Sequence, residues 1–361
     1  MSKPSRTWRL NVLIAVALCF QITSGIAAAQ TPSNQATANV IEVSGDIEGI
    51  HDPSMIQDKG TWYVFSTQTG PASEGELPIH CSKDLHRWTR CGSVLQDIPA
   101  WIKKQSPGTK GLWAPDISYF GGMFHLYYAF SLFGKNTSGI ALLTNKTLDA
   151  KSSDYRWNDE GLVLLSNATD DFNAIDPNLV TDRNGAHWLA FGSFWSGIKM
   201  RKLNASGKLD PSDTKIYSLA GRKKPDNPPP AKPGLPADWQ AIEAPFIVAH
   251  GGYYYLFVSL DLCCRGAKST YKIAMGRSKE VTGPYVDENG APLAAGGGTV
   301  ILAGNHVWVG PGGQSVAKDG EDMMVFHAYD STSGKPSLQL STISWQSGWP
   351  RITLAGNTNT N

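Results

Sequence analysis

The chain has 361 residues, of which 41% are hydrophobic and 17% are charged, and its formal net charge is +1. This length is ample for a sizeable core, in one large domain or two ordinary ones. The near-neutral charge balance lacks the basic footprint of a nucleic-acid-binding protein and gives no attraction to an acidic membrane surface. We therefore expect neither nucleic acid nor a membrane among its partners.

The N-terminus has the features of a secretory signal. Basic residues precede the apolar stretch "LNVLIAVALCF", and "AAAQ" offers a small-residue cleavage site after Ala29. Residues 1–29 are therefore predicted to be a signal peptide, with an uncleaved anchor as the alternative. No later segment reaches the ~18 apolar residues that a membrane helix needs. The mature chain, residues 30–361, is expected to be secreted or periplasmic.

Removal of this signal leaves an even number of cysteines, which permits disulfides in an exported chain. Cys81 and Cys91 flank "SKDLHRWTR", a spacing that suits a bridge across a hairpin. Cys263 and Cys264 are adjacent, so they either form a vicinal bridge or stay reduced. No spacing among the four is that of a zinc site.

A repeated unit organises the rest of the chain. Five times, at intervals of about 65 residues, a glycine-containing turn leads into an aromatic or β-branched run that is typical of a strand. The five copies are "KGTWYVFST", "GGMFHLYYAFS", "NGAHWLAFGSF", "GGYYYLFVSL" and "DGEDMMVFHAYD". Just upstream of each copy lies a proline followed by a short apolar strand, in "HDPSMIQD", "WAPDISYF", "IDPNLVTD", "EAPFIVAH" and "GPGGQSVAKD".

Five nearly all-β units of this size predict an all-β fold, a five-bladed β-propeller with four-stranded antiparallel blades. A β-sandwich is the competing architecture, but it gives no reason for the period. The proline-rich stretch from Ala220 to Trp239 is interpreted as a surface loop between blades, because the repeat continues on both sides of it. A domain linker is the alternative.

The propeller hypothesis predicts a site. The innermost strand of each blade lines the central channel, so the polar residues at the heads of the five strands converge at one mouth of it. Four of these heads carry an acid: Asp52, Asp116, Asp176 and Glu243. Clustered carboxylates serve in metal binding, in acid–base catalysis or in sugar binding. Inverting glycoside hydrolysis needs one carboxylate as base and one protonated carboxyl as acid, and a third carboxylate nearby raises the pKa of the acid.

Motifs along the whole mature chain resemble those of glycoside hydrolase family 43, and in particular its endo-α-1,5-L-arabinanases. The matching segments run in the family's order from His51 to about Asp330. They are "HDPS", "LWAPDI", "FGKNTS", "NAIDPNLV", "FGSFWSGI", "EAPF", "CCRG", "STYKIAMGRSKEVTGPY" and "GPGGQSV".

The resemblance implies a role for each acid: Asp52 as general base, Asp176 as the residue that modulates the pKa and orients the acid, and Glu243 as general acid. It implies that Trp113 and Phe133 stack on arabinose rings, although aromatic residues of a β core are the alternative. Asn173, Ile175, Ser193 and Trp195 fall in motifs that line the family's substrate groove. His51 is expected to support Asp52 by hydrogen bonding, and Asp116 to be structural.

The predicted metal site departs from the family's pattern. Many family members have "GPGH" in the fifth blade, and that histidine approaches a central calcium or sodium ion. Gly313 stands at this position here. A structural calcium or sodium ion in the channel is therefore in doubt, and Gln314 and His327 are the remaining candidates for holding one. No organic cofactor is expected.

The preferred hypothesis is a secreted, inverting endo-hydrolase of arabinan, the side chain of pectin, acting as a monomer. An exo-acting α-L-arabinofuranosidase or β-xylosidase on the same scaffold is the first alternative. Such enzymes often close the groove with an added β-sandwich, for which the short segment after the fifth repeat leaves no room. A non-catalytic sugar-binding propeller would have lost the acids, all of which are present. A retaining five-bladed hydrolase lacks supporting motifs here.

Overall fold

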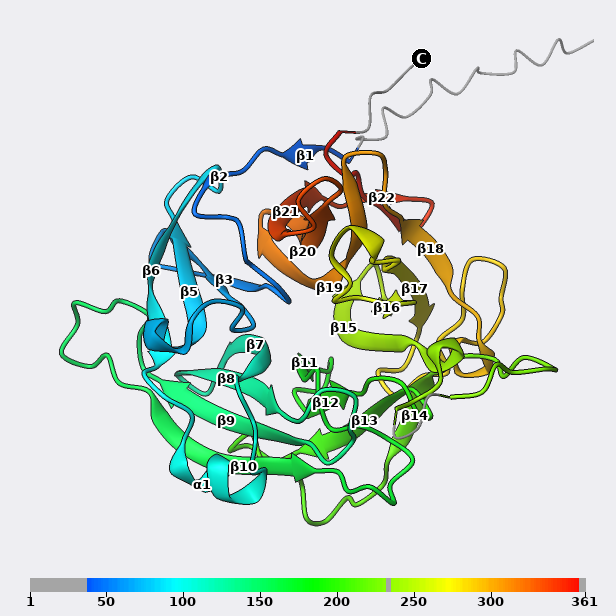
Figure 1. Ribbon diagram of the computed structural model, residues 1–361, viewed down its shortest axis with the longest axis horizontal. Coiled ribbons are helices and arrows are strands. Elements are labelled where there is room, and N and C mark those ends of the chain that lie inside the picture. Colours follow the sequence, from blue (N-terminus) through cyan, green and yellow to red (C-terminus); the bar gives the residue numbers. More distant parts are fainter. Residues whose placement is uncertain (1–37, 232–234, 357–361) are drawn as a thin grey trace, which may run out of the picture. The chain divides into compact units, whose positions relative to one another are not determined.

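The computed structural model describes residues 38–231 and 235–356, so the predicted signal peptide lies outside the described residues. These residues form five small antiparallel sheets arranged in a ring, which confirms the predicted five-bladed β-propeller (Figure 1). Among them, no helix is both long enough and apolar enough to span a membrane.

The blades follow one another in chain order, each built from its innermost strand outward. The first two blades comprise β3 (Ser54–Asp58), β4 (Thr61–Phe65), β5 (Glu76–Ser82) and β6 (Arg87–Leu95), then β7 (Trp113–Phe120), β8 (Met123–Phe130), β9 (Gly139–Asn145) and β10 (Asn158–Leu165). The next two comprise β11 (Asn178–Thr181), β12 (His187–Phe191), β13 (Ile198–Leu203) and β14 (Tyr217–Ala220), then β15 (Ile242–His250), β16 (Tyr253–Leu260), β17 (Lys272–Ser278) and β18 (Thr299–Leu302).

The fifth blade joins the two ends of the described chain. Its three inner strands are β19 (Trp308–Asp319), β20 (Glu321–Asp330) and β21 (Pro336–Thr342). The outermost strand is β1 (Val40–Ile41), which pairs antiparallel with β21 and so closes the ring (Figure 1). The repeat pattern did not reveal this strand, because two residues are too few to carry an alternation.

Small elements decorate the ring. The first blade gains a short parallel strand, β2 (Ser44–Gly45), beside β6. A two-stranded hairpin, β22 (Ser344–Gln346) and β23 (Trp349–Arg351), follows the last blade, and one short helix, α1 (Ala100–Gln105), connects the first two blades. Single 3₁₀ turns occur at Ala72–Glu74, Asp238–Gln240, Gly266–Lys268 and Leu293–Ala295.

The predicted glycine turns join the first two strands of each blade. In the first, second and fourth blades the two turn residues both have positive φ, as in Gly121 (58°) and Gly122 (79°) between β7 and β8. Two consecutive residues with positive φ define the hairpin turn whose twist matches that of the strands. The third blade has a longer turn, closed by Thr181 and His187.

Hydrophobic packing lies between the blades. The buried apolar residues fall into five clusters, and each cluster combines side chains of two neighbouring blades. The cluster between the first and fifth blades, for example, contains Val64 and Trp88 together with Val325 and Leu338. Each blade therefore buries both faces, and the five innermost strands contact one another in a closed ring.

The cysteines resolve into two disulfides. Cys81–Cys91 bridges β5 and β6, with 5.9 Å between the Cα atoms, as the spacing suggested. Cys263–Cys264 is a vicinal bridge in the loop after β16. The proline-rich stretch lies between β14 of the third blade and β15 of the fourth, in agreement with the interpretation as a loop between blades, and its residues Leu235, Pro236 and Asp238 line the cavity described below.

Candidate active site

The heads of the innermost strands share an unusual backbone. In every blade the residue before the proline has positive φ: Asp52 (49°), Ala114 (42°), Asp176 (55°), Ala244 (51°) and Gly310 (58°). A residue before proline normally prefers extended backbone, and a left-handed conformation is costly outside glycine. In β7, β15 and β19 this conformation coincides with a register irregularity, so the regular pairing with the next strand is interrupted there.

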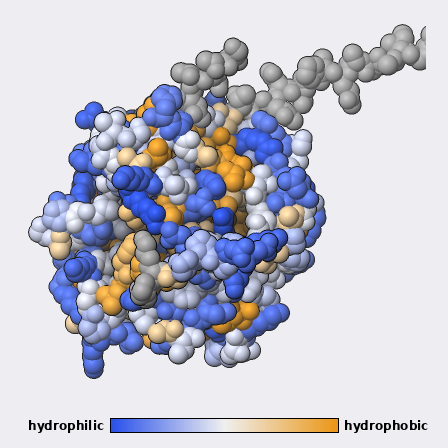
Figure 2. All heavy atoms as spheres, turned by 45° about the vertical axis from the view of Figure 1, so that its right-hand side comes forward, coloured by the Kyte–Doolittle hydropathy of each residue, from blue (hydrophilic) through white to orange (hydrophobic). Residues whose placement is uncertain are grey.

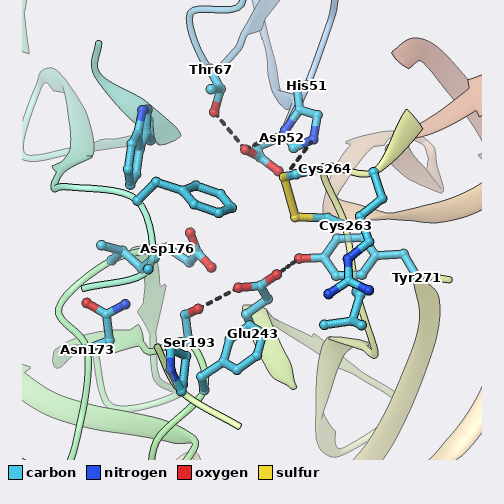
Figure 3. Close-up of a pocket in the computed structure, with 18 of the residues that line it drawn as sticks. His51, Asp52, Thr67, Asn173, Asp176, Ser193, Glu243, Cys263, Cys264 and Tyr271 are labelled. Carbon is cyan, nitrogen blue, oxygen red and sulfur yellow. Dashed lines mark hydrogen bonds and ion pairs between the residues drawn. A yellow bond between two sulfur atoms is a disulfide. The ribbon is translucent and has the colours of Figure 1, made fainter. Parts of the chain in front are cut away.

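Three of the four acids at the strand heads line a common cavity, and the fourth does not. Asp52 and Asp176 occupy the left-handed position itself, and Glu243 lies one residue before it in its own blade. All three line one open cavity of about 570 Å³, into which the side chains project (Figure 3). Asp116, one residue after its proline, lies outside this cavity. Its carboxylate accepts hydrogen bonds from the Leu179 N–H (2.8 Å) and the Asn178 amide (3.1 Å), which agrees with the predicted structural role.

Asp52 is held by three groups. His51 Nδ1 lies 2.8 Å from Asp52 Oδ2, and the Thr67 hydroxyl donates to the same oxygen at 2.7 Å. The Asp52 N–H donates to His327 Nδ1 at 3.1 Å. Burial alone would raise the pKa of Asp52. The charge and hydrogen bond of His51, with contributions from His327 and Thr67, outweigh burial and lower this pKa to about 2.

Behind His51, a further hydrogen-bond chain reaches the next loop. His51 Nε2 lies 2.7 Å from the Tyr329 hydroxyl, which accepts a hydrogen bond from the Cys264 N–H at 2.9 Å. These contacts hold the His51 ring with Nδ1 toward Asp52 and Nε2 toward Tyr329. His51 is thereby fixed in the orientation that supports Asp52.

Glu243 has the opposite electrostatic character. It is buried, and its two oxygens accept hydrogen bonds from Ser193 Oγ (2.5 Å) and from the Tyr271 hydroxyl (Figure 3). Burial and the charge of Asp52 raise the pKa of Glu243 to about 7, although the Ser193 hydrogen bond lowers it in part. The acid therefore keeps its proton at a pH where Asp52 is ionised.

Asp176 titrates together with Glu243. Burial, followed by the charges of Glu243 and Asp52, raises the pKa of Asp176 well above its ordinary range, and the hydrogen bond from the Ala244 N–H (3.1 Å) opposes this. Two like-charged carboxylates at close range disfavour double ionisation. The pair therefore retains a proton to higher pH than isolated carboxyl groups would.

All six predicted substrate-contact residues line the same cavity: Trp113, Phe133, Asn173, Ile175, Ser193 and Trp195. Phe133 is 77% exposed, so it is not a core aromatic, whereas Trp113 is half-buried. Asn173 is buried, and its Oδ1 has no hydrogen-bond partner among the described residues. A buried amide oxygen without a partner is costly unless a ligand satisfies it.

Sequence analysis missed several lining residues. Thr67 and Tyr271 bond directly to Asp52 and Glu243, but Thr67 lies in the segment after β4 and Tyr271 directly before β17. Neither residue is an acid or a histidine, so nothing in the local pattern marks them. The vicinal disulfide also lines the cavity; its "CCRG" motif had no assigned role.

A model of the family described as glycosyl hydrolases family 43 matches residues 47–350. The chain belongs to this family. Extracellular endo-α-(1→5)-L-arabinanase 1 of Bacillus subtilis is 39% identical, over 96% of this chain and 99% of the relative. Extracellular exo-α-(1→5)-L-arabinofuranosidase ArbA of Cellvibrio japonicus is 42% identical, over 84% of this chain and 86% of the relative.

A solved structure extends the likeness to a complex with a ligand. The Cellvibrio cellulosa α-L-arabinanase complexed with arabinohexaose superposes with a TM-score of 0.78 at 41% identity, over 85% of this chain and 96% of that one. These comparisons agree with the resemblance to family 43 glycoside hydrolases.

The candidate metal ligands of this family 43 member already take part in hydrogen bonds within the fold. Gln314 uses both ends of its amide, since Oε1 accepts from Ser259 Oγ (2.8 Å) and Nε2 donates to the Ala244 carbonyl (2.6 Å). His327 Nδ1 accepts from Asp52, so the neutral ring carries its proton on the buried Nε2 and presents no lone pair there. A histidine substituted for Gly313 would clash with Asp52, because its Cβ would lie 2.4 Å from Asp52 Oδ1.

We predict a bell-shaped dependence of kcat/KM on pH. Activity requires ionised Asp52 and protonated Glu243, so kcat/KM should be highest between about 2 and about 7 and fall as pH rises through about 7. Ser193→Ala removes a hydrogen bond that stabilises ionised Glu243. The basic limb should therefore move up by roughly one pH unit.

The control for this experiment is Ser206→Ala, because Ser206 is exposed and its hydroxyl donates to Asn204 outside the cavity. Its pH profile should superpose on that of the parent protein. A Ser193→Ala profile that also superposes, or whose basic limb moves to lower pH, would contradict the assignment of this limb to Glu243.

We predict that chelation has little effect. A bound ion stabilises the native state by an amount set by its concentration relative to its dissociation constant, and the amide of Gln314 and Nδ1 of His327 are already used in hydrogen bonds. Prolonged dialysis against a chelator should leave arabinan hydrolysis and Tm nearly unchanged. One equivalent of calcium retained through that dialysis, measured by elemental analysis, would show this prediction to be wrong.

Proposed function

We propose that this protein is a secreted, inverting endo-hydrolase of α-1,5-L-arabinofuranosidic bonds in arabinan. One observation carries the proposal. A carboxylate with a strongly lowered pKa, Asp52, and a carboxyl group with a raised pKa, Glu243, line one open cavity. Inverting hydrolysis requires an ionised base and a protonated acid at the same pH.

Asp52 acts as the general base in this mechanism. It takes a proton from a water molecule, whose oxygen attacks the anomeric carbon from the face opposite the leaving group. The His51 contact and the Thr67 hydrogen bond hold the carboxylate in place. Thr67 is itself fixed, because its Oγ1 accepts the Ala114 N–H at 2.8 Å.

Glu243 acts as the general acid. It gives its proton to the glycosidic oxygen as the bond from that oxygen to the anomeric carbon breaks. Ser193 and Tyr271 hold the carboxyl group, one on each oxygen. Asp176 titrates together with Glu243, and repulsion between the two carboxylates keeps a proton on the pair.

The substrate class follows from the relatives. The Bacillus subtilis relative is named an endo-α-(1→5)-L-arabinanase, and the Cellvibrio cellulosa structure is a complex with arabinohexaose. In this protein the exposed Phe133 and the half-buried Trp113 supply apolar faces for sugar rings. The unpartnered Oδ1 of Asn173 accepts a sugar hydroxyl.

An exo-acting enzyme is the second candidate. The observation that favours it is the 42% identity with the Cellvibrio japonicus relative, which is named an exo-arabinofuranosidase. The size of the first products distinguishes the two activities.

Export is part of the proposal. Two curated relatives are named extracellular, and the described residues carry two disulfides, which form in oxidising compartments. We propose that residues 1–29 direct this export and that the mature protein acts as a monomer.

Digestion of linear arabinan tests the function. An endo-hydrolase should release a series of oligosaccharides at early times, as measured by chromatography, and the new reducing ends should have the β-configuration by NMR before mutarotation. Release of a single short product from the start would support exo action. An initial α-anomer would point to a covalent intermediate and would remove Asp52 from the role of base.

A second experiment tests the acid. Glu243→Gln cannot donate the proton, so arabinan hydrolysis should fall by about 10²- to 10⁴-fold. An aryl arabinofuranoside with a nitrophenolate leaving group needs no protonation, and the loss should be much smaller on it. Equal losses on both substrates in a folded variant would contradict the role of Glu243.

A further inference from the structure

The vicinal disulfide has no evident structural purpose. A disulfide stabilises a fold chiefly by closing a loop of the unfolded chain, and the effect grows with loop length. Cys263 and Cys264 are neighbours in sequence, so their bond joins no separate segments. The Cys81–Cys91 bridge, by contrast, ties two strands across ten residues of sequence.

The position of the vicinal disulfide is in the wall of the cavity. Cys264 is exposed and Cys263 partly exposed, and both line the cavity together with Asp52 and Glu243. Cys264 Sγ lies 3.9 Å from His51 Nε2, on the far side of that ring from Asp52. Figure 3 shows the disulfide between the His51–Asp52 pair and Tyr271, across the cavity from Asn173 and Asp176.

The loop that carries the disulfide is rigidly held. The Cys264 N–H donates to Tyr329 at 2.9 Å, and Cys264 adopts the left-handed conformation at φ 63°. On either side, the Thr270 N–H donates to the Leu262 carbonyl at 2.8 Å and the Arg265 N–H donates to Ser269 Oγ at 3.1 Å. Backbone strain that the surroundings maintain is typical of binding sites.

The chemistry of this surface suits the face of a sugar ring. Two sulfur atoms and their Cβ carbons are polarizable and apolar, and a disulfide has no hydrogen to donate. Asn173, on the other side, offers an amide oxygen without a protein partner. A furanose ring between them would direct a hydroxyl to Asn173 and its C–H groups to the sulfurs. The face of the molecule in Figure 2 carries other apolar groups, but these are interspersed with hydrophilic residues.

We propose that the Cys263–Cys264 disulfide is a contact surface for the arabinose ring bound at the scissile bond. The proposal rests on the proposed arabinan-hydrolase function and adds two specificity-determining residues to it. The predicted contribution is to binding, because the surface touches the ring and takes no part in proton transfer.

The test measures binding in the absence of turnover. Arabinohexaose is titrated into the Glu243→Gln protein by calorimetry, with and without the additional substitutions Cys263→Ala and Cys264→Ala. The Kd should rise by about threefold to tenfold. Alanine keeps the N–H that bonds Tyr329, so the hydrogen-bond chain to His51 is preserved.

The matched control removes the other disulfide. Cys81→Ala with Cys91→Ala, in the same Glu243→Gln background, should leave Kd unchanged, because β5 and β6 lie outside the cavity. An unchanged Kd in a folded protein without the vicinal disulfide would overturn the proposal. So would an equal rise of Kd in the control, which would indicate a general effect of losing a disulfide.

Reduction provides a second route if the Cys263→Ala, Cys264→Ala protein does not fold. In the Cys81→Ala, Cys91→Ala background, a reductant acts on the vicinal disulfide alone among the described residues. Reduction should weaken arabinohexaose binding and reoxidation should restore it, whereas an unchanged Kd would overturn the proposal. Failure of the parent protein to hydrolyse arabinan would instead reject the proposed function, and the disulfide proposal with it.

Discussion

Packing of blade against blade is the constraint on which the rest of the structure depends. A single four-stranded sheet has two apolar faces here, and neither can be buried within its own blade. The five hydrophobic clusters solve this by sharing every core between two neighbours. If the ring stayed open, the first and last blades would each leave one apolar face exposed. The pairing of β1, from the N-terminal part, with β21 holds the fifth blade to the start of the chain and closes the ring.

Ring closure also creates the site. Five equivalent strand heads converge at one mouth of the channel, each with a left-handed residue before its proline, and in three blades this position coincides with an irregularity of the ladder. Two of these positions hold Asp52 and Asp176. The same backbone device therefore serves all five blades, while the chemistry depends on which side chain each blade places there.

Local surroundings then give similar carboxyl groups different properties. Asp52 has an imidazole and a hydroxyl against its oxygens, so its ionised form is favoured despite burial. Glu243 has neutral hydroxyl donors and a nearby negative charge, so burial prevails and its neutral form persists. The groups that contact each carboxyl therefore make Asp52 a base and Glu243 an acid.

The regular part of this protein could be predicted from the sequence. Alternating apolar strands, glycine turns and the recurring proline give the five blades, and the acids beside those prolines indicate the site. These are local features, repeated often enough to stand out. The family motifs added the six cavity residues around the acids.

Other features depended on tertiary structure because they arise between distant segments. Thr67 and Tyr271 contact the acids and Tyr329 contacts His51 from other segments of the chain, and the pKa values follow from burial that no local pattern encodes. The partners of the metal candidate Gln314, whose amide is bonded at both ends, also come from distant segments. The sequence by itself determined the repeat, the turns and the identity of the acids. Only the tertiary structure decided which groups surround each acid and that a disulfide faces the cavity, because closure of the ring brings together distant side chains such as His51 and Tyr329, 278 positions apart.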